Sequence, residues 1–338
     1  MMDISSTPNT LRLASPRPWK SILLSNFTSW HKFADFLELS EANRTTFEQS
    51  PSFPLNVPFR LAQKIAKNDL NDPILKQFLP TTQERQRAPE FVDDPTQDIS
   101  FQRDERLLHK YHGRALMIAT GACAMHCRYC FRQNYDYPTN NHSLDRSLEI
   151  VANDPSIQEL ILSGGDPLSL MDQQLEHLFH KISQIPHIKR IRIHTRFPVG
   201  IPERIDEPFL KILEESKPQV WFITHINHPR ELDEDVIKAL KSITRLGIPV
   251  LNQSVLLQGV NDDLETLQML SERLVDNGLL PYYLHQLDRV SGTMHFEVCE
   301  SKGQELLEGL KSTLSGYAVP KYVKEIAGDK YKRNVSIP

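Results

Sequence analysis

The sequence has few cysteines and no long apolar run. Four cysteines in 338 residues are too few for a disulfide scaffold. No apolar run approaches the roughly 20 residues that a transmembrane helix needs, and the polar first thirty residues lack the apolar core of a secretory signal. We therefore expect a protein of the reducing cytoplasm, where clustered cysteines bind metals or act in catalysis more often than they form disulfides.

The sequence also lacks an excess of basic residues. It contains 39 Lys and Arg against 43 Asp and Glu, which gives a net charge of −4. Nucleic-acid-binding proteins commonly carry a basic face, so this balance argues against direct nucleic acid binding. Apolar residues make up 39% of the chain and charged residues 24%, which is typical of a folded globular protein.

From residue 114 onward, short apolar segments alternate with helical patterns. The apolar, β-branched segments lie at 115–119, 160–162, 191–194, 220–224, 250–256 and 282–284. The helical patterns lie at 144–153, 172–184, 203–215, 233–246 and 262–277. Near-continuous apolar segments suit strands buried on both faces, and their alternation with helices is typical of parallel βαβ units. Six such units predict an α/β fold, either a partial barrel or an open doubly wound sheet.

The first part of the chain has a different pattern. Short helical patterns at 28–39 and 41–48 are followed by scattered prolines, and the segment 93–105 is polar and acidic. We therefore divide the chain into three regions. These are a helical N-terminal extension with a linker (1–105), a barrel (106–300) and a C-terminal segment with a helix (301–338).

Three cysteines are clustered directly after the first predicted strand. Cys123, Cys127 and Cys130 have the spacing C-x3-C-x2-C, whereas Cys299 stands alone and is expected to be structural. Three thiolates can hold one metal centre and leave a coordination position open, as a reactive cluster requires. A tetrahedral zinc site would need a fourth ligand. The same spacing could form one buried face of a helix, but Gly121 and the nearby arginines disfavour that interpretation.

This motif, with an aromatic residue before its last cysteine, resembles the signature of radical S-adenosylmethionine (SAM) enzymes. In that superfamily three thiolates hold a [4Fe-4S] cluster, the amino and carboxylate groups of SAM bind the fourth iron, and an electron from the cluster generates a 5′-deoxyadenosyl radical. The segment 163–167 (SGGDP) follows the second predicted strand and resembles the superfamily's GGD motif. The resemblance implies a partial (β/α)6 TIM-like barrel.

Further motifs resemble the lysine 2,3-aminomutase family over about two thirds of the chain, from Tyr111 onward. The segments 191–198 (IRIHTRFP), 224–229 (THINHP) and 251–262 (LNQSVLLQGVND) follow in the family's order at predicted strand ends. The resemblance implies an isomerase that converts (S)-α-lysine to (R)-β-lysine. Its cofactors would be the [4Fe-4S] cluster, S-adenosylmethionine and pyridoxal 5′-phosphate, the last bound in the C-terminal segment.

The pyridoxal-binding lysine of the family follows a Ser-Gly-Tyr-x-Val-Pro segment, which is present here at 315–320. By position, the Schiff-base lysine falls on Lys332. Lys330 remains an alternative, because the glycine-rich run that precedes the family's lysine is reduced here to Gly328.

The resemblance also implies roles for other residues at matching positions. Arg132 would hold the substrate carboxylate, and Asp288 with Glu325 would bind the distal ammonium group of the substrate. Since the family has two aspartates there, Glu325 is a departure that bears on recognition of free lysine. Arg114, with Tyr111 beside it, would bind the cofactor phosphate. The complete cofactor-binding set is Gly164, Gly165, Asp166, His225, Gln253, Arg114 and Tyr111.

The length of the chain bears on its expected partners. Fermentative lysine aminomutases continue into a longer tail after the cofactor lysine. This shorter form resembles the bacterial aminomutase that supplies β-lysine for a lysine of translation elongation factor P. The resemblance implies lysine as the substrate, a functional link to elongation factor P and its lysyl-tRNA-synthetase-like ligase, and an external flavodoxin-like electron donor.

Other functions remain open at this point. A radical SAM enzyme of another substrate class would use the three cysteines without pyridoxal phosphate. A barrel metal-dependent hydrolase would use His194, His225 and His285, which all lie at predicted strand ends. A non-catalytic zinc-binding module is a third interpretation.

Overall fold

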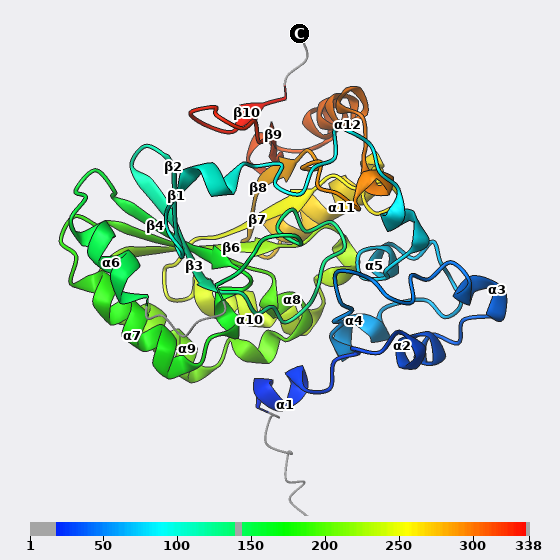
Figure 1. Ribbon diagram of the computed structural model, residues 1–338, viewed down its shortest axis with the longest axis horizontal. Coiled ribbons are helices and arrows are strands. Elements are labelled where there is room, and N and C mark those ends of the chain that lie inside the picture. The colour runs from blue at the N-terminus through cyan, green and yellow to red at the C-terminus, as the bar shows by residue number, and fades with distance from the viewer. Residues whose placement is uncertain (1–17, 139–143, 336–338) are drawn as a thin grey trace, which may run out of the picture.

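A computed structural model describes residues 18–138 and 144–335, and its centre is one sheet of ten strands in sequential order (Figure 1). Strands β3 to β9 run parallel, whereas β1, β2 and β10 are antiparallel to their neighbours. The strands are β1 (Gln102–Asp104), β2 (Leu107–Tyr111), β3 (Arg114–Thr120), β4 (Glu159–Gly164), β5 (Arg190–Thr195), β6 (Gln219–His225), β7 (Val250–Val255), β8 (Leu280–His285), β9 (Lys321–Lys324) and β10 (Arg333–Asn334).

The six predicted strands are present as β3 to β8. Their sequential order distinguishes the partial barrel from the doubly wound sheet, in which the strand order reverses at a switch point. The predicted α/β partial barrel is therefore confirmed. A seventh parallel strand, β9, extends it, and its pairing with β8 matches Tyr283 to Lys321.

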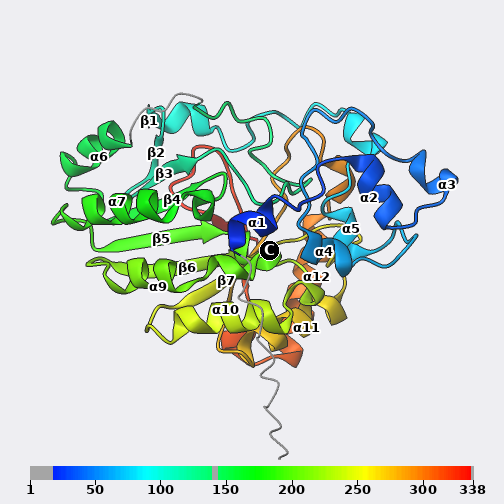
Figure 2. The ribbon, with the colours of Figure 1, turned by 90° about the horizontal axis from the view of Figure 1, so that it is seen from below.

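Helices between the parallel strands cover the outer face of the sheet (Figures 1 and 2). They are α6 (Asp145–Ala152), α7 (Asp172–Ser183), α9 (Glu207–Glu214), α10 (Glu234–Thr244) and α11 (Leu264–Val275), whereas the short α8 (Phe197–Gly200) directly follows β5 and contacts α4 (Phe59–Gln63) of the N-terminal region. Asp233 caps α10, because its carboxylate accepts a hydrogen bond of 2.9 Å from the backbone N–H of Val236. Gly247 follows that helix with φ +74°, a left-handed conformation that favours glycine.

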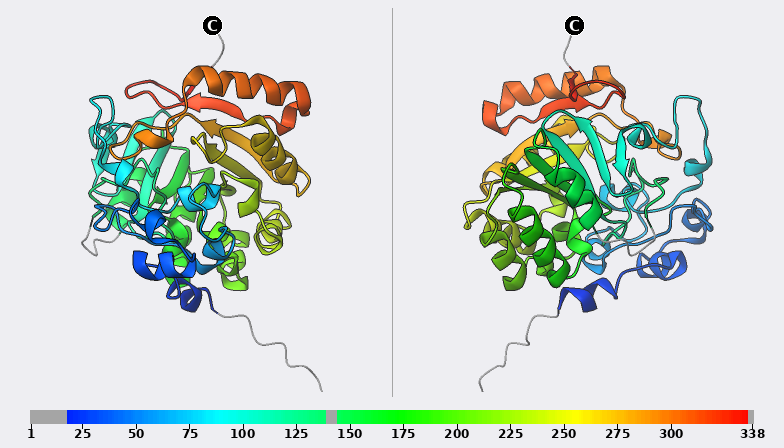
Figure 3. Two further views of the ribbon diagram at one scale, coloured as in Figure 1. Left: turned by 90° about the vertical axis from the view of Figure 1, so that its right-hand side faces the viewer. Right: turned by 60° about the vertical axis from the view of Figure 1, so that its left-hand side comes forward.

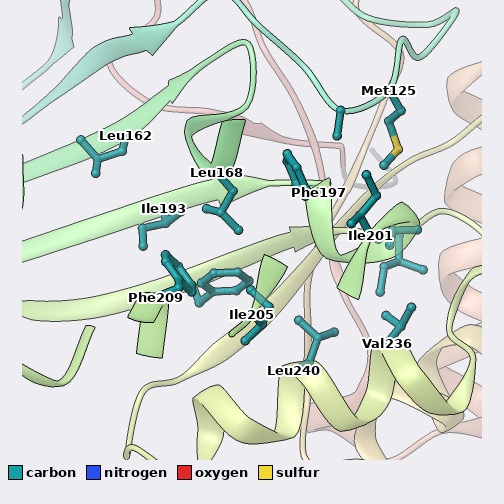
Figure 4. Packing of buried hydrophobic residues seen from close by; sticks show 14 of the residues in the cluster. Met125, Leu162, Leu168, Ile193, Phe197, Ile201, Ile205, Phe209, Val236 and Leu240 are labelled. Carbon is teal, nitrogen blue, oxygen red and sulfur yellow. The ribbon is translucent and has the colours of Figure 1, made fainter. Parts of the chain in front are cut away.

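The core lies between the sheet and these helices. Leu162 and Ile193 from β4 and β5 belong to the same apolar cluster as Phe209 of α9 and Leu240 of α10 (Figure 4). All four side chains are almost completely buried. Burial of one such side chain contributes about 1.5–3 kcal/mol, so this layer fixes the strands and the positions of their ends.

The N-terminal region packs against the barrel where the strands end (Figure 2). Its helices are α1 (Trp19–Leu23), α2 (Trp30–Phe36), α3 (Glu41–Arg44), α4 (Phe59–Gln63) and α5 (Pro73–Lys76). Phe33, Leu61 and Phe78 are fully buried, and they belong to the same apolar cluster as the barrel core. The rings of Trp19 and Phe197 meet edge to face at 5.6 Å.

Helix α12 (Glu300–Thr313), β9 and β10 lie together on one side of the molecule (Figure 3). Leu306 and Leu310 of α12 pack with Tyr322 of β9 and Leu284 of β8. This second apolar cluster anchors the C-terminal segment to the barrel. Within the described residues, we find no helix with the length and apolar character required to cross a membrane.

Candidate active site

The candidate site lies at the carboxyl ends of the parallel strands. Because β3 to β9 run in the same direction, residues that end or follow these strands meet at one rim of the barrel. The structure brings the predicted residues to this rim as follows: the cysteine loop follows β3, Gly164 ends β4 and Gly165 and Asp166 follow it, His225 ends β6, Gln253 lies in β7, Asp288 follows β8 and Glu325 follows β9.

The cysteine loop presents three free thiols. Burial raises the pKa of the Cys123 thiol, and Asp166 and the other two cysteines of the loop add to the effect. Burial, together with Cys127, raises the pKa of Cys130 to about 11. Cys123, Cys127 and Cys130 are therefore close enough to influence one another electrostatically. Cys299 is also free, but it is exposed at the start of α12.

The N-terminal region holds the backbone of this loop. The amide of Asn56 donates to the carbonyl of Cys123 over 3.2 Å, and the amide of Asn26 donates to that of Ala124 over 2.7 Å. Arg128, whose side chain is fully buried, forms an ion pair with Glu84. The loop therefore takes its conformation from contacts with residues far away in the sequence.

The two glycines after β4 lie directly against the cysteine loop. A Cβ on Gly165 would lie 2.4 Å from the carbonyl oxygen of Ala122, and one on Gly164 would lie 2.7 Å from that of Thr120. Gly164 also has φ +110°, which L side chains rarely adopt. The backbone after β4 therefore approaches the backbone of the cysteine loop so closely that a side chain at either glycine would not fit.

Asp166 organises the next turn of the rim. Its buried carboxylate accepts hydrogen bonds from the Thr195 hydroxyl and from the backbone N–H groups of Leu168, Arg196 and Phe197. Burial raises the pKa of Asp166, and these donors act in the opposite direction. The residue therefore connects the end of β4 to the end of β5.

A polar cluster fills the interior next to these turns. The side-chain amide of Gln253 lies 2.7 Å from Nε2 of His225 and 3.2 Å from Nδ1 of His194. Burial lowers the pKa of His225 to about 3, and it also lowers those of His194 and His285 well below the usual value. The three rings are therefore neutral at physiological pH.

The described residues contain no group of three or more His, Cys, Asp or Glu side chains that could hold a metal ion. The hydrolase and zinc-module interpretations would require such a group.

Lys332 and Glu325 form an ion pair at the rim. The Nζ of Lys332 lies 2.7 Å from one oxygen of Glu325, and Lys110 and Tyr111 hydrogen-bond to the other. Burial alone would raise the pKa of Glu325, but Lys332, Lys110 and Tyr111 outweigh it and lower the value to about 2. Lys330, the alternative cofactor lysine, is exposed to solvent.

The other predicted substrate and phosphate residues have partners of their own. Burial raises the pKa of Asp288 to about 6, since the nearby Lys332 offsets only part of the effect. The buried Arg132 donates from Nε to Asp98 over 2.8 Å. The Arg114 guanidinium lies 4.4 Å from the centre of the Tyr111 ring. We did not identify Asp98 as a site residue from the sequence, although it belongs to the acidic segment 93–105.

Several buried polar atoms at the rim lack a protein partner. Among the described residues, His194 Nε2, Thr224 Oγ1 and Arg196 Nε have no hydrogen bond. Buried polar groups are normally paired, so these atoms fit polar ligands that supply the missing contacts. Together with the three free thiols of the cysteine loop and an amine beside a carboxylate, the residues present fit a cluster, S-adenosylmethionine and pyridoxal phosphate.

Comparison with known proteins agrees with this arrangement. Residues 117–270 match the Radical SAM superfamily. The fold is similar to that of SuiB from Streptococcus suis in a structure bound to S-adenosylmethionine, with a TM-score of 0.50 and 14% identity over 68% of this chain and 54% of that one. The barrel and its cysteine loop therefore define a radical SAM protein.

The sequences of similar proteins show to which family within this superfamily the chain belongs. The chain is 40% identical to an L-lysine 2,3-aminomutase of Haemophilus influenzae, over 93% of this chain and 94% of the relative. It is 39% identical to that of Escherichia coli, over 96% of each chain. A relative from Clostridium subterminale is 37% identical over 78% of this chain and 64% of its own length. The chain belongs to the L-lysine 2,3-aminomutase family.

Proposed function

We propose that this protein is a pyridoxal-phosphate-dependent radical SAM isomerase that converts (S)-α-lysine to (R)-β-lysine. The observation that carries the proposal is the placement of Lys332 beside Glu325 at the rim where the cysteine loop also follows β3. The aminomutase reaction requires an amine for pyridoxal and thiols for a cluster, and the position of both at the strand ends supports the proposal.

Cys123, Cys127 and Cys130 would hold the [4Fe-4S] cluster, and the proposed residues for S-adenosylmethionine are Gly164, Gly165, Asp166, His225 and Gln253. When bound, these cofactors supply the adenosyl radical that removes a hydrogen atom from the substrate. Gly164 and Gly165 allow the end of β4 to lie against the cysteine loop. Asp166 acts through the backbone that it holds. Neutral His225 and Gln253 offer polar contacts without charge.

Lys332 would bind pyridoxal 5′-phosphate, and Arg114 with Tyr111 would hold the phosphate. This cofactor supplies a carbonyl group that binds the substrate amine and allows the nitrogen to migrate. In the structure Glu325 holds the amine of Lys332 at a fixed place on the rim. The Arg114 guanidinium packs on the Tyr111 ring, which orients its donors for a phosphate.

Lysine would be oriented by charges at both of its ends. Arg132 would hold the α-carboxylate, and Asp98 keeps the Arg132 guanidinium in place. Asp288 and Glu325 would bind the distal ammonium. The rim therefore offers a positive and a negative binding site, as a substrate with charged groups at both ends requires.

We also propose a role in the β-lysylation of elongation factor P. The product would pass to a ligase related to lysyl-tRNA synthetase, and a flavodoxin-like donor would reduce the cluster. The near-complete mutual coverage with the Haemophilus influenzae and Escherichia coli relatives supports placing this chain with them. The free thiols support the reducing cytoplasm as its location.

The test is an anaerobic assay of the reconstituted enzyme with free lysine and, separately, with elongation factor P. We expect β-lysine from free lysine after addition of S-adenosylmethionine and a reductant, and none from a Cys127→Ala variant. Formation of β-lysine from neither substrate would refute the proposed reaction. Absence of a borohydride-reducible pyridoxal adduct in an otherwise active enzyme would favour a radical SAM reaction without that cofactor.

A further inference from the structure

One buried arginine links the cysteine loop to the N-terminal region. The Nη1 of Arg196 donates to the sulfur of Cys127 over 2.8 Å and also to the hydroxyl of Tyr129. Its Nη2 donates to Gln77 and to Glu231, each over 2.7 Å. The arginine follows β5, whereas Gln77 comes from the N-terminal region just after α5.

The surroundings allow this guanidinium little freedom. The backbone N–H of Arg196 donates to Asp166, and the ring of Phe78 lies 5.0 Å from the guanidinium carbon. The side-chain amide of Asn227 donates to the same oxygen of Gln77 that Arg196 uses, and also to Tyr129. The arginine is therefore oriented by a closed polar network rather than by chance contact.

The hydrogen bond from Arg196 to Cys127 bears on the reduction potential of the cluster that this cysteine would hold. The reduction potential of an iron–sulfur cluster depends on its net charge and on hydrogen bonds to its sulfurs. A cation that donates to a ligand sulfur stabilises the more negative, reduced cluster, and this raises the potential. Glu231 offsets part of the positive charge of Arg196, since the pair is buried and 2.7 Å apart.

We propose that Arg196 is a positioning residue that raises the reduction potential of the cluster through its hydrogen bond to Cys127. Gln77 is the part of the N-terminal region that holds Arg196 in place. Reduction by one electron from the donor is then easier in this environment than with the sulfur unpaired. The inference rests on the cluster of the proposed function, but it does not depend on the substrate.

The test compares cluster potentials in reconstituted variants. In Arg196→Met and Gln77→Leu, we expect a more negative midpoint potential than in the wild type, with the larger shift for Arg196→Met. At a fixed dithionite potential, the reduced-to-oxidised ratio should fall about tenfold in Arg196→Met, which corresponds to about 59 mV for one electron. Arg196→Lys retains the charge and should restore part of the potential.

Iron and sulfide contents are measured first, so that the two proposals are tested separately. A wild-type protein that holds no cluster would contradict the proposed function, whereas an unchanged potential in a fully loaded Arg196→Met variant would overturn the present inference. If Arg196→Met does not retain its cluster, the potentials of Gln77→Leu and Arg196→Lys provide the test. Midpoint potentials equal to that of the wild type in both variants would overturn the inference. The control is Arg190→Lys, which alters a half-exposed arginine at the start of β5 and should leave the potential unchanged.

Discussion

The Nζ of Lys332 lies 2.7 Å from the carboxylate of Glu325, across the turn that joins β9 to β10. The pairing of β9 with β10 matches Arg333 to Lys324, so the residues next to this ion pair are themselves paired strand residues. The position of the proposed cofactor lysine therefore depends on this hairpin as well as on its own side chain.

The two candidate lysines should differ in one measurement. Lys332→Ala should abolish the absorbance band of bound pyridoxal and the adduct trapped by borohydride, because its amine is the one held at the rim. Lys330→Ala should retain both, since Lys330 is exposed. Loss of the adduct in Lys330→Ala alone would show that the assignment is wrong.

Binding of lysine should depend on pH through Asp288, whose pKa is raised to about 6 by burial. Its carboxylate must be ionised to bind an ammonium, so kcat/KM for lysine should rise as the pH increases from about 5 to 7. Asp288→Asn should remove this rise and increase KM by roughly 10- to 100-fold, the loss of a charged hydrogen bond. Asp276→Asn, at an exposed position, should retain the wild-type profile.

Ionisation of Asp288 should lower the stability of the folded protein, although it favours binding of lysine. The folded protein binds the Asp288 proton more tightly than the unfolded chain, where the pKa is near 4. The contribution of this residue to the free energy of unfolding should therefore decrease as the pH rises from about 4 to 6. Thermal midpoints measured across this range should fall less in Asp288→Asn than in the wild type. An identical pH dependence in both proteins would contradict the prediction.

A methyl group at Gly165 should displace the cysteine loop. The added Cβ would lie 2.4 Å from a backbone oxygen, which cannot move aside as a flexible side chain could. Gly165→Ala should therefore cost about 1–3 kcal/mol of stability and lower the iron content after reconstitution. Gly316→Ala provides the matched control, because no heavy atom lies within 4 Å of its added Cβ.

Asn56 should help to retain the cluster although it is not a ligand. Asn56→Ala removes the hydrogen bond to the Cys123 carbonyl and a contact with Asn26. We expect a loss of about 1 kcal/mol of stability and faster loss of iron to a chelator. Asn153→Ala removes an exposed hydrogen bond to the carbonyl of Glu149 at the C-terminal end of α6 and should leave iron retention unchanged. Equal rates in all three proteins would exclude a role for the N-terminal contact.

The sequence allowed prediction of the elements with a strong periodic signal. The strands β3 to β8 are apolar segments of six or seven residues between helices. Such a pattern can be recognised from the local sequence alone. The strands β1, β9 and β10 have only three, four and two residues, too few to show alternation. They form because neighbouring strands offer unpaired edges, which is a property of the assembled sheet.

The site was partly predictable for a similar reason. The cysteines and glycines are close in sequence and carry a recognisable spacing, whereas the contacts of Arg196 join residues that are 35 to 119 positions apart. Gln77 and Glu231 carry no local signal, because a buried polar residue can be recognised only when its partner is known. The one available signal was the position of Arg196 directly after a predicted strand.

The barrel wall is completed by side chains between β2 and β9. These strands belong to opposite ends of the sheet, and Lys110 and Tyr111 of β2 reach across to Glu325 after β9. These side-chain contacts can separate without breaking any hydrogen bond between strands. The ion pair between Lys110 and Glu325 also weakens as salt screens the charges. Because Lys332 shares the same carboxylate, separation of Lys110 and Tyr111 from Glu325 would also change the charge environment of this amine.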